Sequence, residues 1–273
     1  MDAATFAAAQ LFKALPRVTL SRIVGRLCEQ PLPPRVSRVM QGAFVRAYGV
    51  DLAEAAPREG AYRSFDELFT RPLRDGARQV HPDGLVSPAD GVLTATGHMS
   101  RGGILEVKGQ PYTVAELVGE VGMPHPFQKG TFAVIYLSPR DYHRVHSPAD
   151  GHITRIRGVT GDLFPVNSVG ERIPGVYVRN SRVAIHIETD SFGLITVVMV
   201  GAVLVGRISV RALLSKRIAG ELHEFPHAVK VSKGEELGTF HLGSTVVLLI
   251  EAERRLVAGG QRVRYGESLL QAS

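Results

Sequence analysis

The sequence predicts an α+β protein, with helices at the N-terminus followed by a mainly antiparallel β body. Three observations predict this class. Over the first 50 positions, apolar residues recur at helical spacing between basic ones. From about Val86, short runs rich in valine and isoleucine are separated by glycine, as is typical of strands joined by turns. The sequence Ser-Pro-Ala-Asp-Gly also occurs twice in this body, at residues 87–91 and 147–151.

Residues 3–29 are expected to form a helix in two pieces, broken near Pro16. An apolar stripe follows both pieces, and Arg22 and Arg26 lie off it. Residues 1–50 hold seven basic and two acidic side chains, an excess of five in a chain whose net charge is +6. This pattern is typical of an amphipathic helix lying on an anionic membrane. The alternative is a surface helix packed on the protein's own core.

The sequence indicates neither a membrane-spanning helix nor a signal peptide. The longest apolar run, residues 194–206, is shorter than the roughly 20 residues that a spanning helix needs, so we interpret it as buried strands. Asp2 precedes the first apolar stretch, and Gln10 and Lys13 interrupt it, unlike a signal peptide. Cys28 is the only cysteine, which excludes an intramolecular disulfide, and we interpret it as a packing residue.

We expect two regions, a helical membrane-associating region at 1–70 and a β-rich catalytic domain at 71–273. After a proline-rich connector, a short helix is expected at residues 35–49. Ser64 and Glu67 have the spacing of a capping box that opens a further helix.

The repeated Ser-Pro-Ala-Asp-Gly segments predict two similar turns in a duplicated, lipoyl-like sandwich unit, because Asp and Gly tolerate tight backbone turns. A lipoyl or biotinyl carrier needs a lysine at its hairpin tip, and neither segment contains one. For Asp150 we favour a structural role in the turn. Asp90 is the stronger candidate for a catalytic role.

Three segments could together supply a serine nucleophile system. They are Leu242–Thr245, which contains Ser244, then Asp141–His146, which contains two histidines, and the turn at Asp90. Histidine can take the serine proton while aspartate orients the imidazole. Neither a zinc-binding pattern nor the Gly-x-Ser-x-Gly motif of the α/β-hydrolases accompanies them, so we expect no metal. The residues alone leave their roles open.

The order of several short motifs resembles the bacterial phosphatidylserine decarboxylases from about residue 60 to 250. These motifs are Ser87–Gly91, Tyr142–His146, Arg179-Asn180, Phe192-Gly193, Val200–Ala202, Lys233–Gly238 and Phe240–Thr245. The Leu-Gly-Ser-Thr segment near the C-terminus, about 100 residues after Tyr-His-Arg-Val-His, is the most specific pair. The first 50 residues match only in being basic and apolar.

The resemblance implies a proenzyme that cuts itself between Gly243 and Ser244, with Asp90, His146 and Ser244 as the self-cleavage triad. It implies a β chain of residues 1–243 and an α chain of residues 244–273 that stay associated. The resemblance also implies that Ser244 becomes a covalent pyruvoyl group, which would form a Schiff base with the substrate amine. His143 corresponds to a histidine implicated in decarboxylation, and we expect it to deliver the proton that replaces CO2.

The expected substrate is phosphatidylserine, the expected product is phosphatidylethanolamine, and the expected location is peripheral, on the cytoplasmic face of the cell membrane. The apolar residues between the N-terminal arginines favour an anionic membrane over nucleic acid as the partner. Self-association of the chain stays open. One alternative is a pyruvoyl decarboxylase of a soluble amino acid. Another is a non-enzymatic phosphocarrier-like β module that uses His143 or His146 and leaves the chain uncut.

Overall fold

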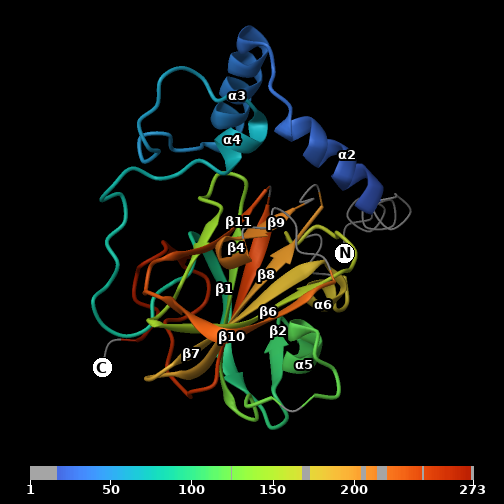
Figure 1. Cartoon of the computed structure of the whole chain (residues 1–273), viewed down its shortest axis with the longest axis vertical. Helices are drawn as coiled ribbons and strands as arrows, with labels where there is room; N and C mark the ends of the chain where they lie inside the picture. Colours follow the sequence, from blue (N-terminus) through green and yellow to red (C-terminus); the bar gives the residue numbers. More distant parts are fainter. Residues whose placement is uncertain are drawn as a thin grey trace.

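A computed structural model describes residues 17–123, 125–167, 173–203, 207–213, 220–241 and 243–271. It confirms an α+β architecture in which an antiparallel β body carries a helical end. Figure 1 shows α2, α3 and α4 gathered at one end of the body, with β2 and α5 at the other. Within the described ranges, no helix is long and apolar enough to cross a membrane.

The helical end consists of α2 (Arg17–Glu29), α3 (Pro34–Tyr48) and α4 (Phe65–Phe69). The predicted break near Pro16 lies at the border of the described residues, and residues 3–16 lie outside them. Helix α3 begins with Pro34, whose fixed φ suits a first helical position, and ends at Tyr48, where Gly49 caps it in the left-handed conformation. Apolar α3 side chains remain exposed, with Val39 at 72%. These helices therefore do not bury their apolar surface fully against the body.

Ser64 caps α4 as predicted, since its hydroxyl accepts the Glu67 N–H at 3.1 Å. The second half of the capping box differs from the prediction. The Glu67 carboxylate accepts the N–H of Arg63 rather than that of Ser64. The Glu67 carboxylate therefore still accepts a backbone N–H before the helix, one residue earlier than in a standard capping box.

The predicted strands form one eight-stranded antiparallel sheet in the order β10-β6-β7-β8-β12-β4-β1-β13. The bounds are β1 Gly91–Met99, β4 Gly130–Leu137, β6 Gly151–Val159, β7 Arg182–Thr189, β8 Gly193–Gly201, β10 Leu222–Val231, β12 Ser244–Ile250 and β13 Arg262–Val263. Strand β8 confirms the buried-strand interpretation of the long apolar run over residues 194–201, while residues 204–206 of that run lie outside the described residues. Every residue of β12 is buried, and this strand lies between β4 and β8, so the core is centred on it.

Smaller elements complete the body. A three-stranded sheet has the order β5-β11-β9, with β5 Arg144–His146, β9 Ile208–Val210 and β11 Glu236–Phe240. A hairpin of β2 (Ile104–Val107) and β3 (Gln110–Thr113) leads into the short helix α5 (Val114–Val118). The short helices α6 (Val176–Arg179) and η2 (Arg211–Leu213) lie in connections between strands.

The two Ser-Pro-Ala-Asp-Gly segments occupy equivalent positions and bind each other. Each ends at the first residue of a long strand, β1 or β6. The N–H of Val86 donates to the Pro148 carbonyl, and the N–H of His146 donates to the Pro88 carbonyl. In each copy the serine hydroxyl donates to the carbonyl two residues on, at 2.7 Å.

A second, weaker repeat follows the same symmetry. Residues 231–237 read Val-Ser-Lys-Gly-Glu-Glu-Leu and residues 263–269 read Val-Arg-Tyr-Gly-Glu-Ser-Leu. Gly234 and Gly266 both take positive φ, at 81° and 88°, and donate their N–H to Ser147 and Ser87. The residue before each glycine donates its N–H to the repeat aspartate, Lys233 to Asp150 and Tyr265 to Asp90. Asp150 thus binds a segment 83 positions further along the chain, just as Asp90 binds the equivalent segment in the other copy.

Candidate active site

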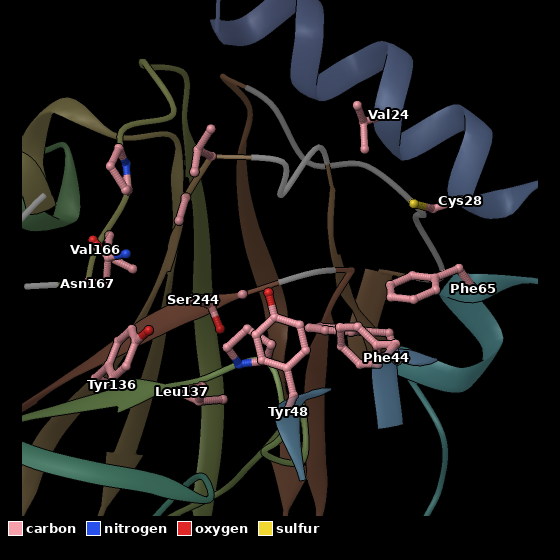
Figure 2. Close-up of a pocket in the computed structure, with 16 residues that line it drawn as sticks. Val24, Cys28, Phe44, Tyr48, Phe65, Tyr136, Leu137, Val166, Asn167 and Ser244 are labelled. Atoms are coloured by element: carbon pink, nitrogen blue, oxygen red, sulfur yellow. The ribbon is translucent and has the colours of Figure 1, made fainter. Parts of the chain in front are cut away.

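A mostly apolar pocket of about 360 Å³ lies between the helical end and the β body. Its floor includes Gly243 and Ser244, at the start of β12, and Leu137, at the end of β4. Figure 2 shows Ser244 beside Tyr136 and Leu137, with Val24, Cys28 and Phe65 contributed from the helical end. Cys28 therefore lines this pocket as well as packing against its neighbours. Burial is the main cause that raises the pKa of its thiol.

The backbone of Ser244 is fixed by strand pairing, while its hydroxyl has no partner among the described residues. As the first residue of β12 it pairs with Leu137 on one side and Gly201 on the other. The side chain is fully buried, and Oγ has no hydrogen-bond partner among the described residues. A buried hydroxyl without a partner is costly and calls for an explanation such as reactivity. At the preceding Gly243, a Cβ would meet no atom within 4 Å, so the flank of the Gly243–Ser244 bond is open.

His143 lies behind one wall of this pocket. Its ring stacks on Phe69, a pocket residue, with 4.0 Å between centroids. The Nε2–H donates to the Ser138 carbonyl at 3.1 Å, which leaves the lone pair on Nδ1, a buried atom without a described partner. Complete burial lowers the pKa of His143 to about 3, so the imidazole is neutral near pH 7. The Asp141 carboxylate accepts the Ser138 N–H and hydroxyl and so fixes this loop.

His146 is held as a neutral base. Its Nδ1–H donates to the Gly234 carbonyl at 2.8 Å, so Nε2 keeps the lone pair and accepts the Tyr142 hydroxyl at 3.3 Å. The ring of Tyr265 stacks on the face of the His146 ring, with 3.8 Å between the two centroids. Burial is the largest cause that lowers the pKa of His146. Burial likewise raises the pKa of Tyr142, so its phenol stays protonated and can donate.

Asp90 is bound by a cation rather than by an imidazole. Both of its carboxylate oxygens accept from Arg78, and the Tyr265 N–H donates to Oδ1 at 2.8 Å. Arg78 also binds Glu54 at 2.9 Å, so it joins the segment before α4 to the Asp90 turn. Asp90, Arg78 and Tyr142 border a second, polar cavity of about 440 Å³.

The structure places Ser244 at the apolar pocket, with His143 behind its wall. Asp90 and the Tyr142 that binds His146 border the second cavity instead, so the predicted residues do not form one hydrogen-bonded triad. Tyr265 contacts both Asp90 and His146, and no described hydrogen bond joins Asp90, His146 and Ser244 to one another. Sequence reasoning missed Arg78 and Tyr265. The second repeat could have identified Tyr265, because it occupies the position of Lys233 in the other copy. Among the residues that the structure describes, no group of three or more metal-ligating side chains occurs.

Comparisons with known proteins agree on one family. The family model described as phosphatidylserine decarboxylase matches residues 65–271. A phosphatidylserine decarboxylase proenzyme of Acinetobacter baumannii (strain AYE) is 41% identical over 244 residues, 88% of this chain and 86% of the relative. A proenzyme of the same name from Anaeromyxobacter sp. (strain K) is 40% identical over 270 residues, 94% of this chain and 95% of the relative. A third, from Marinobacter nauticus, is 39% identical over 245 residues, 86% and 85% of the two chains.

Proposed function

The chain belongs to the phosphatidylserine decarboxylase family, and we propose that its precursor cuts itself between Gly243 and Ser244 to make a pyruvoyl group at residue 244. The protein is a carboxy-lyase proenzyme that converts phosphatidylserine to phosphatidylethanolamine and CO2. One observation carries the proposal for the cut: the buried Ser244 hydroxyl has no described partner and adjoins an open Gly243 at an apolar pocket of about 360 Å³.

The cleavage needs only the chain's own atoms. Ser244 Oγ attacks the Gly243 carbonyl carbon as its proton passes to a base, and the Gly243–Ser244 C–N bond breaks to leave an ester. Loss of the Ser244 Cα proton then breaks the Cβ–Oγ bond and releases the Gly243 carboxylate. The dehydroalanine left at residue 244 takes up water and releases ammonia. Because nucleophile and carbonyl belong to adjacent residues, proximity supplies much of the rate.

We assign the base to His146, supported by its neutral state and its Nε2 lone pair. In this proposal the Tyr142 hydroxyl, now bound to Nε2, is the link through which the proton moves. Asp90 acts on His146 through Tyr265 and Arg78 rather than by direct contact. Burial keeps His146 uncharged near neutral pH, which suits a group that must accept a proton.

The pocket residues fit a pyruvoyl group at residue 244. When formed, the ketone supplies an electrophile for the substrate amine and an acceptor for the electrons that CO2 leaves behind. Strand β12 holds residue 244 at the pocket floor through backbone pairing that does not involve its side chain.

His143 is the proposed proton donor for the product. Burial keeps it neutral, and an anionic substrate beside it would favour its protonated form.

We also propose that the two products of the cut stay together. Strand β12 would belong to the α chain, yet it lies between β4 and β8 of the β chain and pairs with each over seven residues. Strand β13, also of the α chain, pairs with β1. The paired Ser-Pro-Ala-Asp-Gly turns and the second repeat support the interpretation of the body as a duplicated, lipoyl-like unit.

The helical end is the proposed membrane-docking surface. Its three helices hold six arginines and three acidic side chains, and they expose Leu27 at 62%, Val39 at 72% and Met40 at 50%. The pocket opens among the same helices, so a lipid could enter from the surface on which they lie. We therefore propose a peripheral enzyme on the cytoplasmic face of the cell membrane.

An intact mass spectrum of the purified protein tests the central proposal. We expect a fragment of residues 244–273, lighter by one ammonia than plain hydrolysis would give, because the serine amine is lost as pyruvoyl forms. Ser244→Ala should stay full length and inactive, while Ser191→Ala, at an exposed turn, should process normally. A normally cut Ser244→Ala variant would place the nucleophile elsewhere.

A further inference from the structure

Four side chains outside the proposed reaction form a connected cluster beside the scissile bond. We name it the Asp66 cluster, and it consists of Glu29, Asp66, Arg207 and His241. Glu29 ends α2 and Asp66 lies in α4, so two members belong to the helical end. Arg207 immediately precedes β9, and His241 immediately follows β11, two residues before Gly243. The cluster therefore joins the helical end to the strand that leads into the cut.

His241 is held on both sides of its ring. Its Nδ1 lies 2.7 Å from Asp66 Oδ1, and its Nε2 lies 3.1 Å from the Ser209 hydroxyl oxygen. An Arg207 Nη atom lies 2.6 Å from the same Nδ1, so the ring contacts both members of the Asp66–Arg207 ion pair. Its backbone is fixed as well, because the His241 N–H donates to the Arg207 carbonyl at 3.1 Å and so extends the β9–β11 pairing by one residue.

Arg207 completes the link to the helices. One Nη atom lies 3.1 Å from Glu29 and the other lies 3.0 Å from Asp66, so a single guanidinium bridges α2 and α4. The side chains of Asp66, Arg207 and His241 are each less than one-fifth exposed, where an ion pair is screened less than at the surface.

The cluster contacts the chain on the N-terminal side of the scissile bond, whereas the large sheet fixes the C-terminal side. Ser244 is fixed by its pairing with β4 and β8. The preceding segment is fixed at Phe240, whose N–H donates to the His143 carbonyl at 2.9 Å, and then at His241 by the Asp66 cluster. Gly243 itself borders the pocket and has open space at its Cα. His241 is thus the last residue before Gly243 for which a side-chain anchor is described.

We propose that His241 is a positioning residue for self-cleavage, which through Asp66 and Arg207 keeps the Gly243 carbonyl within reach of the Ser244 hydroxyl. This inference rests on the proposed cut at Gly243–Ser244. It also makes docking of the helical end a condition for efficient processing, since Asp66 and Glu29 come from α4 and α2. The reaction is intramolecular, so a small displacement of the carbonyl removes much of its advantage.

A time course of precursor conversion during cell-free synthesis tests this. Asp66→Asn and His241→Phe should each slow conversion by about 10- to 100-fold, the scale of a misplaced reacting group. The double variant should be little slower than the slower single variant, because both remove the same anchor. His223→Phe is the matched control, since His223 also lies 3.0 Å from a carboxylate, that of Glu221, but on β10.

Two isosteres separate positioning from simple loss of fold. An asparagine at 241 places its amide nitrogen near the former Nδ1, whereas a glutamine places it near Nε2. His241→Asn should therefore keep the contact with Asp66 and convert faster than His241→Gln, at equal midpoints of thermal unfolding. Wild-type conversion in Asp66→Asn and His241→Phe, additive slowing in the double variant, or a reversed order of the isosteres would overturn the inference. An uncut wild-type chain would instead contradict the proposed function.

Discussion

The ring of Tyr265 lies parallel to that of His146, with 4° between their planes and 3.8 Å between their centroids. Tyr265 follows the proposed cut and His146 precedes it, so the two rings would belong to different chains of the mature enzyme. The Tyr265 N–H also binds Asp90 at 2.8 Å. One residue of the future α chain therefore contacts both the aspartate and the histidine that the sequence assigns to self-cleavage.

Replacing Tyr265 by leucine should slow self-cleavage by about 2- to 10-fold, because an aromatic pair contributes about 0.5–1.5 kcal/mol. Tyr265→Phe should process at nearly the wild-type rate, since it keeps the ring and the backbone N–H to Asp90. Conversion of the precursor, followed on a gel, measures both. Equal rates for the leucine and phenylalanine variants would show that the stacked ring does not orient His146.

Removing Arg78 should destabilise the fold more than removing an ordinary ion pair. The side chains of Arg78 and Asp90 are 4% and 8% exposed, so Arg78→Met leaves a buried carboxylate without its cation, at a cost of about 3–5 kcal/mol. Urea unfolding of the precursor form measures the loss, with Ser244→Ala as the common background. Arg155→Met is the control, because Arg155 is one-third exposed. A smaller loss for Arg78→Met than for Arg155→Met would contradict the predicted cost.

Acid should destabilise the protein in part through His143. Its pKa is about 3 in the folded protein and near 6.5 when unfolded, so between these values the unfolded chain binds more protons. Stability is therefore lost as pH falls from about 6.5 towards 3. His143→Gln should flatten this dependence, while a glutamine at the exposed His98 should not. Unfolding free energies measured at several pH values check the slopes, and parallel slopes for wild type and His143→Gln would refute the assignment.

Membrane binding should depend on the basic side chains of the helical end. Changing Arg26, Arg35 and Arg38 to glutamate should weaken co-sedimentation with anionic vesicles, since each basic residue near an anionic surface contributes about 1 kcal/mol. Extension of the charge reversal to Arg17 and Arg22 should weaken it further. Binding should also fall as salt rises.

The control for this experiment reverses three exposed charges away from the helical end, Arg101, Lys129 and Lys230. These variants should still bind vesicles more strongly than the helical-end variants, and both sets should process at residue 244. Equal binding by wild type and the helical-end triple variant would show that these arginines do not anchor the protein.

The sequence by itself determined the main elements and the family of this protein. Helical spacing located α2 and α3, the Ser64 cap located α4, and the alternation of valine-rich runs with glycine located the sheet. These are local signals, because each depends on residues a few positions apart. The Leu-Gly-Ser-Thr and Tyr-His-Arg-Val-His segments identified the family for the same reason, since each is a contiguous string.

Only the tertiary structure decided which side chains meet. Tyr265 reaches His146 across 119 positions of the chain, and Asp66 reaches His241 across 175. Whether Asp90 binds an imidazole or the Arg78 guanidinium depends on distances of a few ångströms between segments that no local pattern relates. The unpartnered Ser244 hydroxyl is likewise a property of its surroundings. Burial sets both the cost of that hydroxyl and the lowered pKa of His143, and burial exists only once the sheet and the helical end have packed together.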